Sequence, residues 1–132
     1  MFYLDEDDQY LMDLDGGRDP RDVSVSDMVR EFSKVTDQQP DPFLYLELIN
    51  EEFTEFLDAE TLDNEVKELA DLIYVIFGYA VAMGYDLEEA VRRVHENNLG
   101  RCIQPDGSVK RREDGKILKN PDYPKINLEG TY

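Results

Sequence analysis

Residues 64–83 combine a nearly continuous apolar run with two carboxylates close to its beginning. From Leu72 to Met83 the segment reads LIYVIFGYAVAM and contains no charged residue. Its length and the glycine that follows predict one long helix, which we expect to be buried nearly all round. Glu68 and Asp71 stand three residues apart and therefore share one side of this helix. Because a buried carboxylate without a partner is costly, this pair needs a positive partner opposite it.

The preceding helix, predicted over residues 42–60, carries a second acidic pair on its apolar side. On a helical wheel Glu52 lies near the centre of the apolar stripe, with Glu55 on its flank and Glu51 at its edge. The stripe consists of Tyr45, Leu48, Ile49, Phe53, Phe56 and Ala59.

Two apolar helix faces thus carry four acids with no cation among them. Solvation near the helix ends, or neutralisation by Lys and Arg, is the ordinary explanation for such charges. Here bound metal ions explain the pattern better, because four such acids would repel one another and lose hydration. Ligands that are all oxygen favour Mg²⁺, with Mn²⁺ as a substitute.

Two further helices complete an all-α, four-helix bundle-type domain. One is predicted over residues 23–36 and is capped by Ser24 or Ser26. The other spans residues 86–99, with Asp86 as N-cap, Glu89 completing a capping box and Gly100 as the C-terminal cap. The predicted divisions are an acidic N-terminal arm (1–22), a helical domain (23–100) and a basic, turn-rich tail (101–132).

Composition limits the classes of protein to which this chain can belong. Its 132 residues suit one domain, and 31 Asp and Glu against 14 Lys and Arg give a net charge of -17. This charge argues against direct nucleic-acid binding. The single cysteine, Cys102, excludes an internal disulfide framework and fits a reducing compartment. With no secretory leader or apolar span of bilayer length, we expect a cytoplasmic protein without membrane association.

Two alternatives to a magnesium site fit the sequence less well. A di-iron centre in a helical bundle needs Glu-x-x-His on two helices, whereas the only histidine, His95, has Arg92 three residues before it. An acidic module that mimics DNA or binds a protein without catalysis would need its acids on the outer surface, and it has no use for the Lys-rich tail.

The acidic motif resembles a known signature. Glu51-Glu52-x-x-Glu55 followed by Glu68-x-x-Asp71 is similar to the E-E-x-x-E…E-x-x-D pattern of the all-α nucleoside triphosphate pyrophosphohydrolases, the superfamily of MazG and the dimeric dUTPases. The resemblance extends over residues 25–124 and is closest to the small MazG-like subgroup. Its downstream part comprises His95-x-x-Asn98 and Asp114-Gly115-Lys116 with Lys119.

The resemblance implies an activity and a role for each matching residue. The reaction would be Mg²⁺-dependent hydrolysis of a nucleoside triphosphate to the monophosphate and pyrophosphate. The implied metal ligands are Glu52, Glu55, Glu68 and Asp71, and Glu51 would act as base toward the attacking water or contact a metal. The implied substrate-binding residues are His95, Asn98, Arg101, Lys116 and Lys119.

Two further expectations concern the base and the assembly. Phe32, Gln38 and Gln39 could stack on or hydrogen-bond a base, although a core Phe and a solvated turn explain them equally well. Large apolar helix faces, together with the resemblance, imply a homodimer or homotetramer in which the tail can reach a neighbouring subunit's site.

Overall fold

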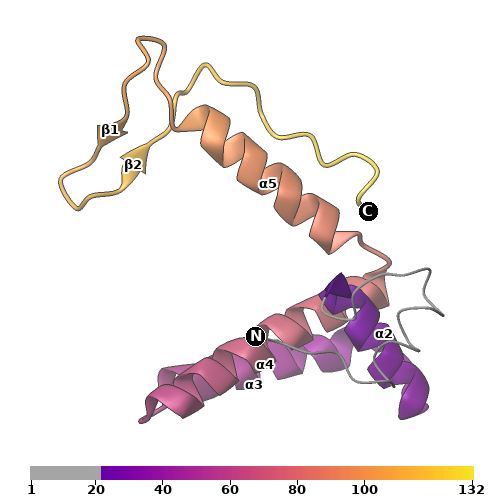
Figure 1. Ribbon diagram of the computed structural model, residues 1–132. Helices are drawn as coiled ribbons and strands as arrows, with labels where there is room; N and C mark the ends of the chain where they lie inside the picture. Colours follow the sequence, from indigo (N-terminus) through magenta and orange to yellow (C-terminus); the bar gives the residue numbers. More distant parts are fainter. Residues whose placement is uncertain (1–21) are drawn as a thin grey trace, which may run out of the picture.

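The structure is a computed structural model that describes residues 22–132. Apart from its last residue, the predicted acidic arm (1–22) lies outside the described residues. The described chain contains four helices and one small hairpin (Figure 1), which confirms the predicted all-α class. The elements are α2 (Val25–Val35), α3 (Pro42–Leu57), α4 (Leu62–Met83), α5 (Leu87–Arg101), β1 (Lys110–Arg111) and β2 (Ile117–Leu118).

Short polar side chains begin all four of these helices, and at the start of α3 the Asp41 carboxylate accepts from the backbone N–H of Phe43. The hydroxyl of Ser24 accepts a hydrogen bond from the backbone N–H of Asp27, and Asp86 caps α5 in the same way. Thr61 caps α4, so this helix begins at Leu62, two residues before its predicted start at residue 64. Gly84 ends α4 with a φ of 77°, a conformation that glycine adopts at little cost.

The predicted ends of α5 are partly wrong. Gly100 lies inside the helix, which continues to Arg101, and the Tyr123 side chain packs where a Cβ at residue 100 would stand. Glu89 does not close a capping box. Its carboxylate pairs with Arg92 and Arg93, while the backbone N–H of Asp86 donates to the carbonyl of Thr131.

Helices α3 and α4 pack along each other as an antiparallel pair, and α2 packs across α4. Helix α5 leaves this pair at an angle and contacts α2 instead (Figure 1). The joint between α2 and α5 includes the Glu88 carboxylate, which accepts hydrogen bonds from the backbone N–H and the hydroxyl of Ser26, at 2.8 and 2.7 Å.

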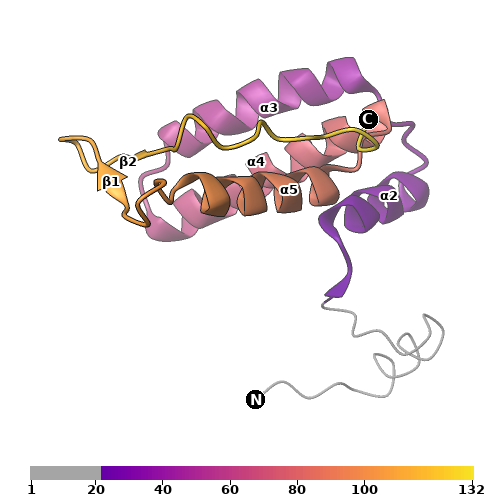
Figure 2. The same ribbon diagram turned by 90° about the horizontal axis from the view of Figure 1, so that it is seen from above.

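The C-terminal tail returns along α5, as Figure 2 shows from above. Arg93 donates to the carbonyl of Glu129 at 2.8 Å, and the side-chain amide of Asn97 donates to the carbonyl of Pro124 at 3.2 Å. We call residues 87–132, which comprise α5, the hairpin and the returning tail, the α5 arm.

Few side chains in the described part of the chain are fully buried. The buried hydrophobic residues are Val29, Tyr45, Val75 and Ala80. The prediction that α4 is buried nearly all round is wrong, because one side of this helix leaves a row of large apolar side chains exposed. Among residues 22–132, no helix combines the length and the apolar character that crossing a membrane would require.

Candidate metal centre

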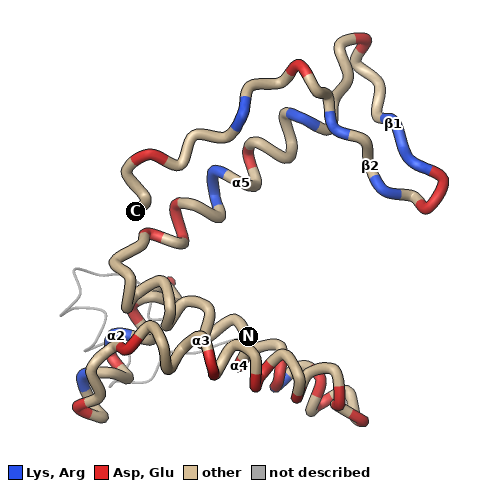
Figure 3. The backbone as a smooth tube through the Cα atoms, turned by 180° about the vertical axis from the view of Figure 1, so that it is seen from behind, with Lys and Arg blue, Asp and Glu red and all other residues tan. Residues whose placement is uncertain are grey.

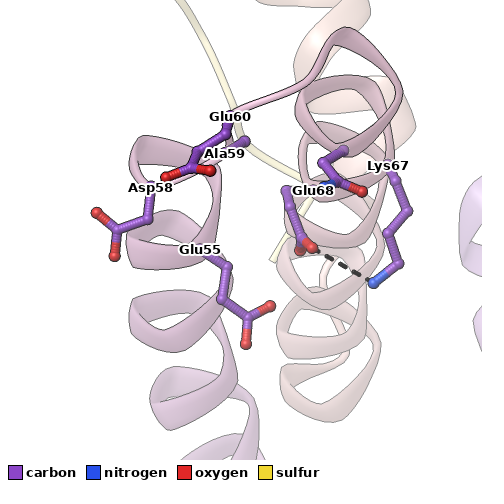
Figure 4. Close-up of a pocket in the computed structure, with 7 residues that line it drawn as sticks. Glu55, Asp58, Ala59, Glu60, Lys67 and Glu68 are labelled. Carbon is purple, nitrogen blue, oxygen red and sulfur yellow. Dashed lines mark hydrogen bonds and ion pairs between the residues drawn. The ribbon is translucent and has the colours of Figure 1, made fainter.

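Three of the predicted metal ligands come together between α3 and α4. Glu52 and Glu55 project from α3 and Glu68 projects from α4, and one carboxylate oxygen of each lies within 4.8 Å of the other two. Figure 4 shows Glu55 and Glu68 reaching from their two helices into the space between them. The antiparallel pairing of α3 and α4 therefore converts two acidic pairs, well separated in sequence, into one carboxylate cluster.

The cluster holds more negative charge than its surroundings compensate. Glu52 Oε2 and Glu68 Oε2 are buried and have no hydrogen-bond partner. Burial, the closely approaching Glu68 carboxylate and the neighbouring charges of Glu55 and Asp71 raise the pKa of Glu52 to about 7. Buried carboxylate oxygens without donors are the arrangement that a divalent cation would satisfy, so the residues present fit such an ion.

A lysine at the edge of the cluster corrects the expectation that no cation stands among the acids. Lys67 Nζ lies 2.9 Å from Asp71 Oδ2 and 3.4 Å from Glu68 Oε1. The pair Lys67 and Asp71 has the i, i+4 spacing that allows such contacts on one helix, so the sequence contained a signal for it. Asp71 is engaged by this lysine and lies outside the three-glutamate cluster.

Two cavities adjoin the carboxylates. The first, of about 490 Å³, lies toward the α3–α4 connection and is lined by Glu55, Asp58, Ala59, Glu60, Asn64, Lys67 and Glu68. The second, of about 240 Å³, is lined by Phe32, Gln38, Tyr45, Leu48, Glu52, Asp71, Tyr74 and Val75. Glu52 and Asp71 are part of the wall of the second cavity. The acidic site therefore borders a cavity that is lined by aromatic side chains, which we call the aromatic cavity.

The aromatic cavity includes residues that the sequence pointed to and residues that it did not. Phe32 and Gln38 line it, whereas Gln39 is not among its lining residues. Tyr74 was missed, although it is three residues after Asp71 and so shares its side of α4. Its ring meets that of Phe32 edge to face, with centroids 6.1 Å apart.

Every predicted substrate-binding residue lies on the α5 arm. Lys119 Nζ donates to Asn98 Oδ1 at 3.0 Å, so the structure brings these two together. His95, Asn98, Lys116 and Lys119 are exposed and Arg101 is half-buried; none of the five lines either cavity. Within one chain, these predicted substrate-binding residues therefore lie on the α5 arm, whereas the carboxylate cluster lies between α3 and α4 (Figure 3).

Glu51, the predicted base, is exposed on α3 beside the cluster. It follows Asn50 and precedes Glu52, and it is not one of the three glutamates whose oxygens converge.

Comparison with known families decides the relationship of this chain. Residues 25–98 match the family described as phosphoribosyl-ATP pyrophosphohydrolase, and this range covers more than half of the sequence. The chain belongs to the phosphoribosyl-ATP pyrophosphohydrolase family. This family is part of the all-α, MazG-like superfamily of nucleoside triphosphate pyrophosphohydrolases, which confirms the resemblance drawn from the acidic motif.

Membership in this family carries a general activity. The phosphoribosyl-ATP pyrophosphohydrolase family consists of hydrolases that act on phosphoanhydride bonds of nucleotides, generally use a divalent metal and often oligomerise. The match includes both acidic pairs and ends at Asn98, so the basic hairpin lies beyond it. No curated protein matches the chain significantly.

Proposed function

We propose that the protein is a Mg²⁺-dependent pyrophosphohydrolase that converts nucleoside or deoxynucleoside triphosphates to the monophosphate and pyrophosphate. The observation that carries this proposal is the cluster of Glu52, Glu55 and Glu68, with two buried carboxylate oxygens that have no partner. In this proposal residues 23–100 form the catalytic domain and residues 101–132 the substrate-binding tail.

The carboxylates serve to hold metal in a position where the triphosphate can reach it. Glu52, Glu55 and Glu68 would bind the ion, and Asp71 would join them when Lys67 releases it. When bound, Mg²⁺ neutralises phosphate charge and lowers the pKa of a bound water. Oxygen ligands at a hard, charged site favour Mg²⁺ or Mn²⁺ over zinc.

Glu51 has a separate role in this proposal. It is exposed on α3, next to Glu52 in the sequence, and its carboxylate can accept a proton from the water that attacks the phosphorus. Glu51→Gln is expected to lower kcat with little change in metal affinity. A loss of metal binding in this variant would instead make Glu51 a ligand.

The positive groups of the α5 arm would bind the phosphates. Asn98, Arg101, Lys116 and Lys119 supply donors and positive charge for the departing pyrophosphate, and His95 would hydrogen-bond near them. Because these groups do not line the acidic cavity of their own chain, we propose that the enzyme acts as a homodimer or homotetramer.

The aromatic cavity is our candidate site for the base. Phe32, Tyr45 and Tyr74 offer ring surfaces, and the amide of Gln38 can donate to or accept from a base edge. A cavity of about 240 Å³ beside Glu52 leaves room for one base while the phosphates face the acids. Tyr74→Ala should raise KM more than it lowers kcat, with Glu65→Ala, at an exposed position of the same helix that lines neither cavity, as the control.

Phosphoribosyl-ATP is a second candidate substrate, favoured by the family that matches residues 25–98. It shares the triphosphate with the first candidate, so the same carboxylates and cations would serve both. The two candidate substrates differ in the groups attached to the base. We therefore expect the residues of the aromatic cavity to determine which substrate is preferred.

The test is incubation with phosphoribosyl-ATP and a panel of canonical and modified ribonucleoside and deoxynucleoside triphosphates, with and without Mg²⁺. Monophosphate, pyrophosphate and orthophosphate are measured separately. The proposal predicts equal amounts of monophosphate and pyrophosphate, only with Mg²⁺, and loss of turnover in Glu68→Gln but not in Glu47→Gln, an exposed acid on α3 outside the cluster. Release of orthophosphate alone would contradict it.

A further inference from the structure

The returning tail, which we define as residues 120–132, is attached to both ends of α5 (Figure 2). At its start the backbone N–H of Asn120 donates to the carbonyl of Arg101 at 2.6 Å. Near its end the carbonyl of Thr131 accepts from the backbone N–H of Asp86 at 2.7 Å. The tail therefore runs antiparallel to α5 over the whole length of the helix, although residues 120–132 contain neither helix nor strand.

Side chains from one face of α5 bind the middle of the tail. Arg93 donates to the carbonyls of Asn127 and Glu129, at 3.2 and 2.8 Å, and the side-chain amide of Asn97 donates to the carbonyl of Pro124 at 3.2 Å. Arg93 and Asn97 are four residues apart and so share this face. These side chains supply the donors that a tail without a helix or sheet needs for its carbonyl groups.

Gly100 continues the same face, three residues after Asn97. It lies inside α5 and is not among the glycines with a positive φ, so the backbone conformation does not require a glycine there. In a helix interior glycine is less favourable than alanine. The ring of Tyr123 occupies the space that a Cβ at residue 100 would need, so this glycine serves the docking of the tail.

A tight turn connects Tyr123 to the start of the returning tail. The backbone N–H of Tyr123 donates to the carbonyl of Asn120 at 3.3 Å, and the Asn120 side chain accepts from the backbone N–H of Asp122 at 3.0 Å. Asn120 directly follows Lys119. The seat of the Tyr123 ring on Gly100 therefore fixes, through this turn, where the backbone of Lys119 lies.

Lys119 is one of the proposed phosphate-binding residues, and its Nζ donates to Asn98 Oδ1 at 3.0 Å. A lysine side chain is long and flexible, so its ammonium group stays near one partner only when its backbone is held nearby. The hairpin offers a second support, because the side-chain amide of Gln104 donates to the carbonyl of Leu118 at 3.1 Å. The docked tail and the hairpin are thus the two candidate supports of Lys119.

We propose that Gly100 and Tyr123 are positioning residues, whose contact docks the returning tail on α5 and thereby holds Lys119 beside Asn98. Neither residue touches substrate in this scheme. The docking stands on the contacts between α5 and the tail. Its consequence for phosphate binding rests on the proposed function, in which Lys119 and Asn98 bind the phosphates.

Docking is tested by amide hydrogen exchange, measured by NMR in the metal-free protein. In Gly100→Ala the amide of Asn120, which is bonded to Arg101 in the docked tail, should exchange at least about tenfold faster than in the wild type. Amides of α3 and α4 should keep their rates. Val91→Ala is the matched control, since Val91 is an exposed residue of α5 that makes none of these contacts to the tail. An unchanged Asn120 rate in Gly100→Ala would overturn the proposal.

Variants of Tyr123 test the same contact without changing α5. Tyr123→Ala should accelerate exchange at Asn120 as Gly100→Ala does, whereas Tyr123→Phe, which keeps the ring, should retain the wild-type rate. The double variant Gly100→Ala with Tyr123→Ala should exchange no faster than Tyr123→Ala, because the added methyl group then meets no ring. Effects of the two substitutions that multiply would show that they act independently and would overturn the contact.

The positioning role is tested by kinetics in two backgrounds. Gly100→Ala should lower kcat/KM by about tenfold when Lys119 is present, since a misplaced cation binds the phosphates poorly. In the Lys119→Ala background the same substitution should cause no further loss, because the side chain that the tail positions is absent. An equal loss in both backgrounds would mean that Gly100 supports the structure in general and would overturn the positioning role.

The two measurements separate this proposal from the proposed function. Hydrogen exchange needs no substrate, so it decides whether Tyr123 docks the tail even if the reaction is wrong. A wild type that hydrolyses no triphosphate would overturn the phosphate role of Lys119 together with the proposed function. Full activity in Gly100→Ala, with an undocked tail, would show that the hairpin alone holds Lys119.

Discussion

Glu52 is the residue at which burial and charge conflict most directly. Its Oε2 atom is buried without a hydrogen-bond partner, and three other carboxylates lie close enough to influence it. Its pKa of about 7 means that the metal-free protein holds a proton there that a metal ion would displace. Metal affinity should therefore increase as the pH rises through 7.

The same pKa predicts how stability depends on pH. An unperturbed glutamate has a pKa of 4.5, so above this pH the unfolded chain releases a proton that the folded chain keeps until about pH 7. Glu52 thus costs the metal-free protein stability as the pH rises from about 5 to about 8. In urea unfolding with EDTA, the free energy of unfolding of Glu52→Gln should increase relative to that of the wild type as the pH rises through this range. A difference in unfolding free energy that does not change with pH would contradict the assignment.

Lys67 lies at the edge of the cluster, and we expect its positive charge to compete with a metal ion. Its ammonium group pairs with Asp71 and Glu68, and these carboxylates hold its pKa above the usual value. Lys67→Met should lower the stability of the metal-free protein, because two acids lose their counter-charge. It should also tighten Mg²⁺ binding by severalfold in the absence of nucleotide, which calorimetry can measure. Weaker Mg²⁺ binding in this variant would mean that Lys67 helps to orient the ligands.

At the scale of elements, the site depends on how closely α3 approaches α4. Tyr45 of α3 is 6% exposed, and its ring lies against Gly78 of α4, where a Cβ would overlap it. This contact brings the two helices together at the aromatic cavity and fixes the register in which Glu52 meets Glu68. The glycine is therefore a packing requirement of the site.

Gly78→Ala is expected to destabilise the fold by about 1–3 kcal/mol, because the added methyl group displaces the Tyr45 ring. Denaturant unfolding of the variant measures this cost. Combining it with Tyr45→Leu, which removes the ring, should recover part of the loss, as a double-mutant cycle would show. Equal stability of Gly78→Ala and the wild type would show that the ring moves aside freely.

The helices were largely predictable from local signals, because capping residues act within one turn. Ser24, Asp86 and Gly84 mark helix ends that the structure confirms. Gly100 misled the prediction, since the reason for a glycine there is the ring of Tyr123, which packs against it from far along the chain. The helical wheel could place Glu52 and Glu68 on facing sides, but it could not show that Lys67 turns toward Asp71.

For the whole molecule, the main departure from the sequence-based expectation is the exposed face of α4. The absence of charged residues from Leu72 to Met83 predicts that this part of the helix is buried. A single sequence does not show which residues pack against it. The structure shows that the α5 arm does not cover it, because hydrogen bonds such as that of Asp86 to Thr131 tie α5 to its own tail. Within residues 22–132, the large apolar side chains along this side of α4 stay exposed.

The claim that α3 and α4 form a metal centre is tested most directly by calorimetric titration of the metal-free protein with Mg²⁺. We expect the wild type to bind Mg²⁺, Glu68→Gln to bind it at least about tenfold more weakly, and Glu47→Gln, outside the cluster, to match the wild type. No binding by the wild type, or equal affinity in Glu68→Gln, would contradict the assignment of Glu52, Glu55 and Glu68 as the ligands.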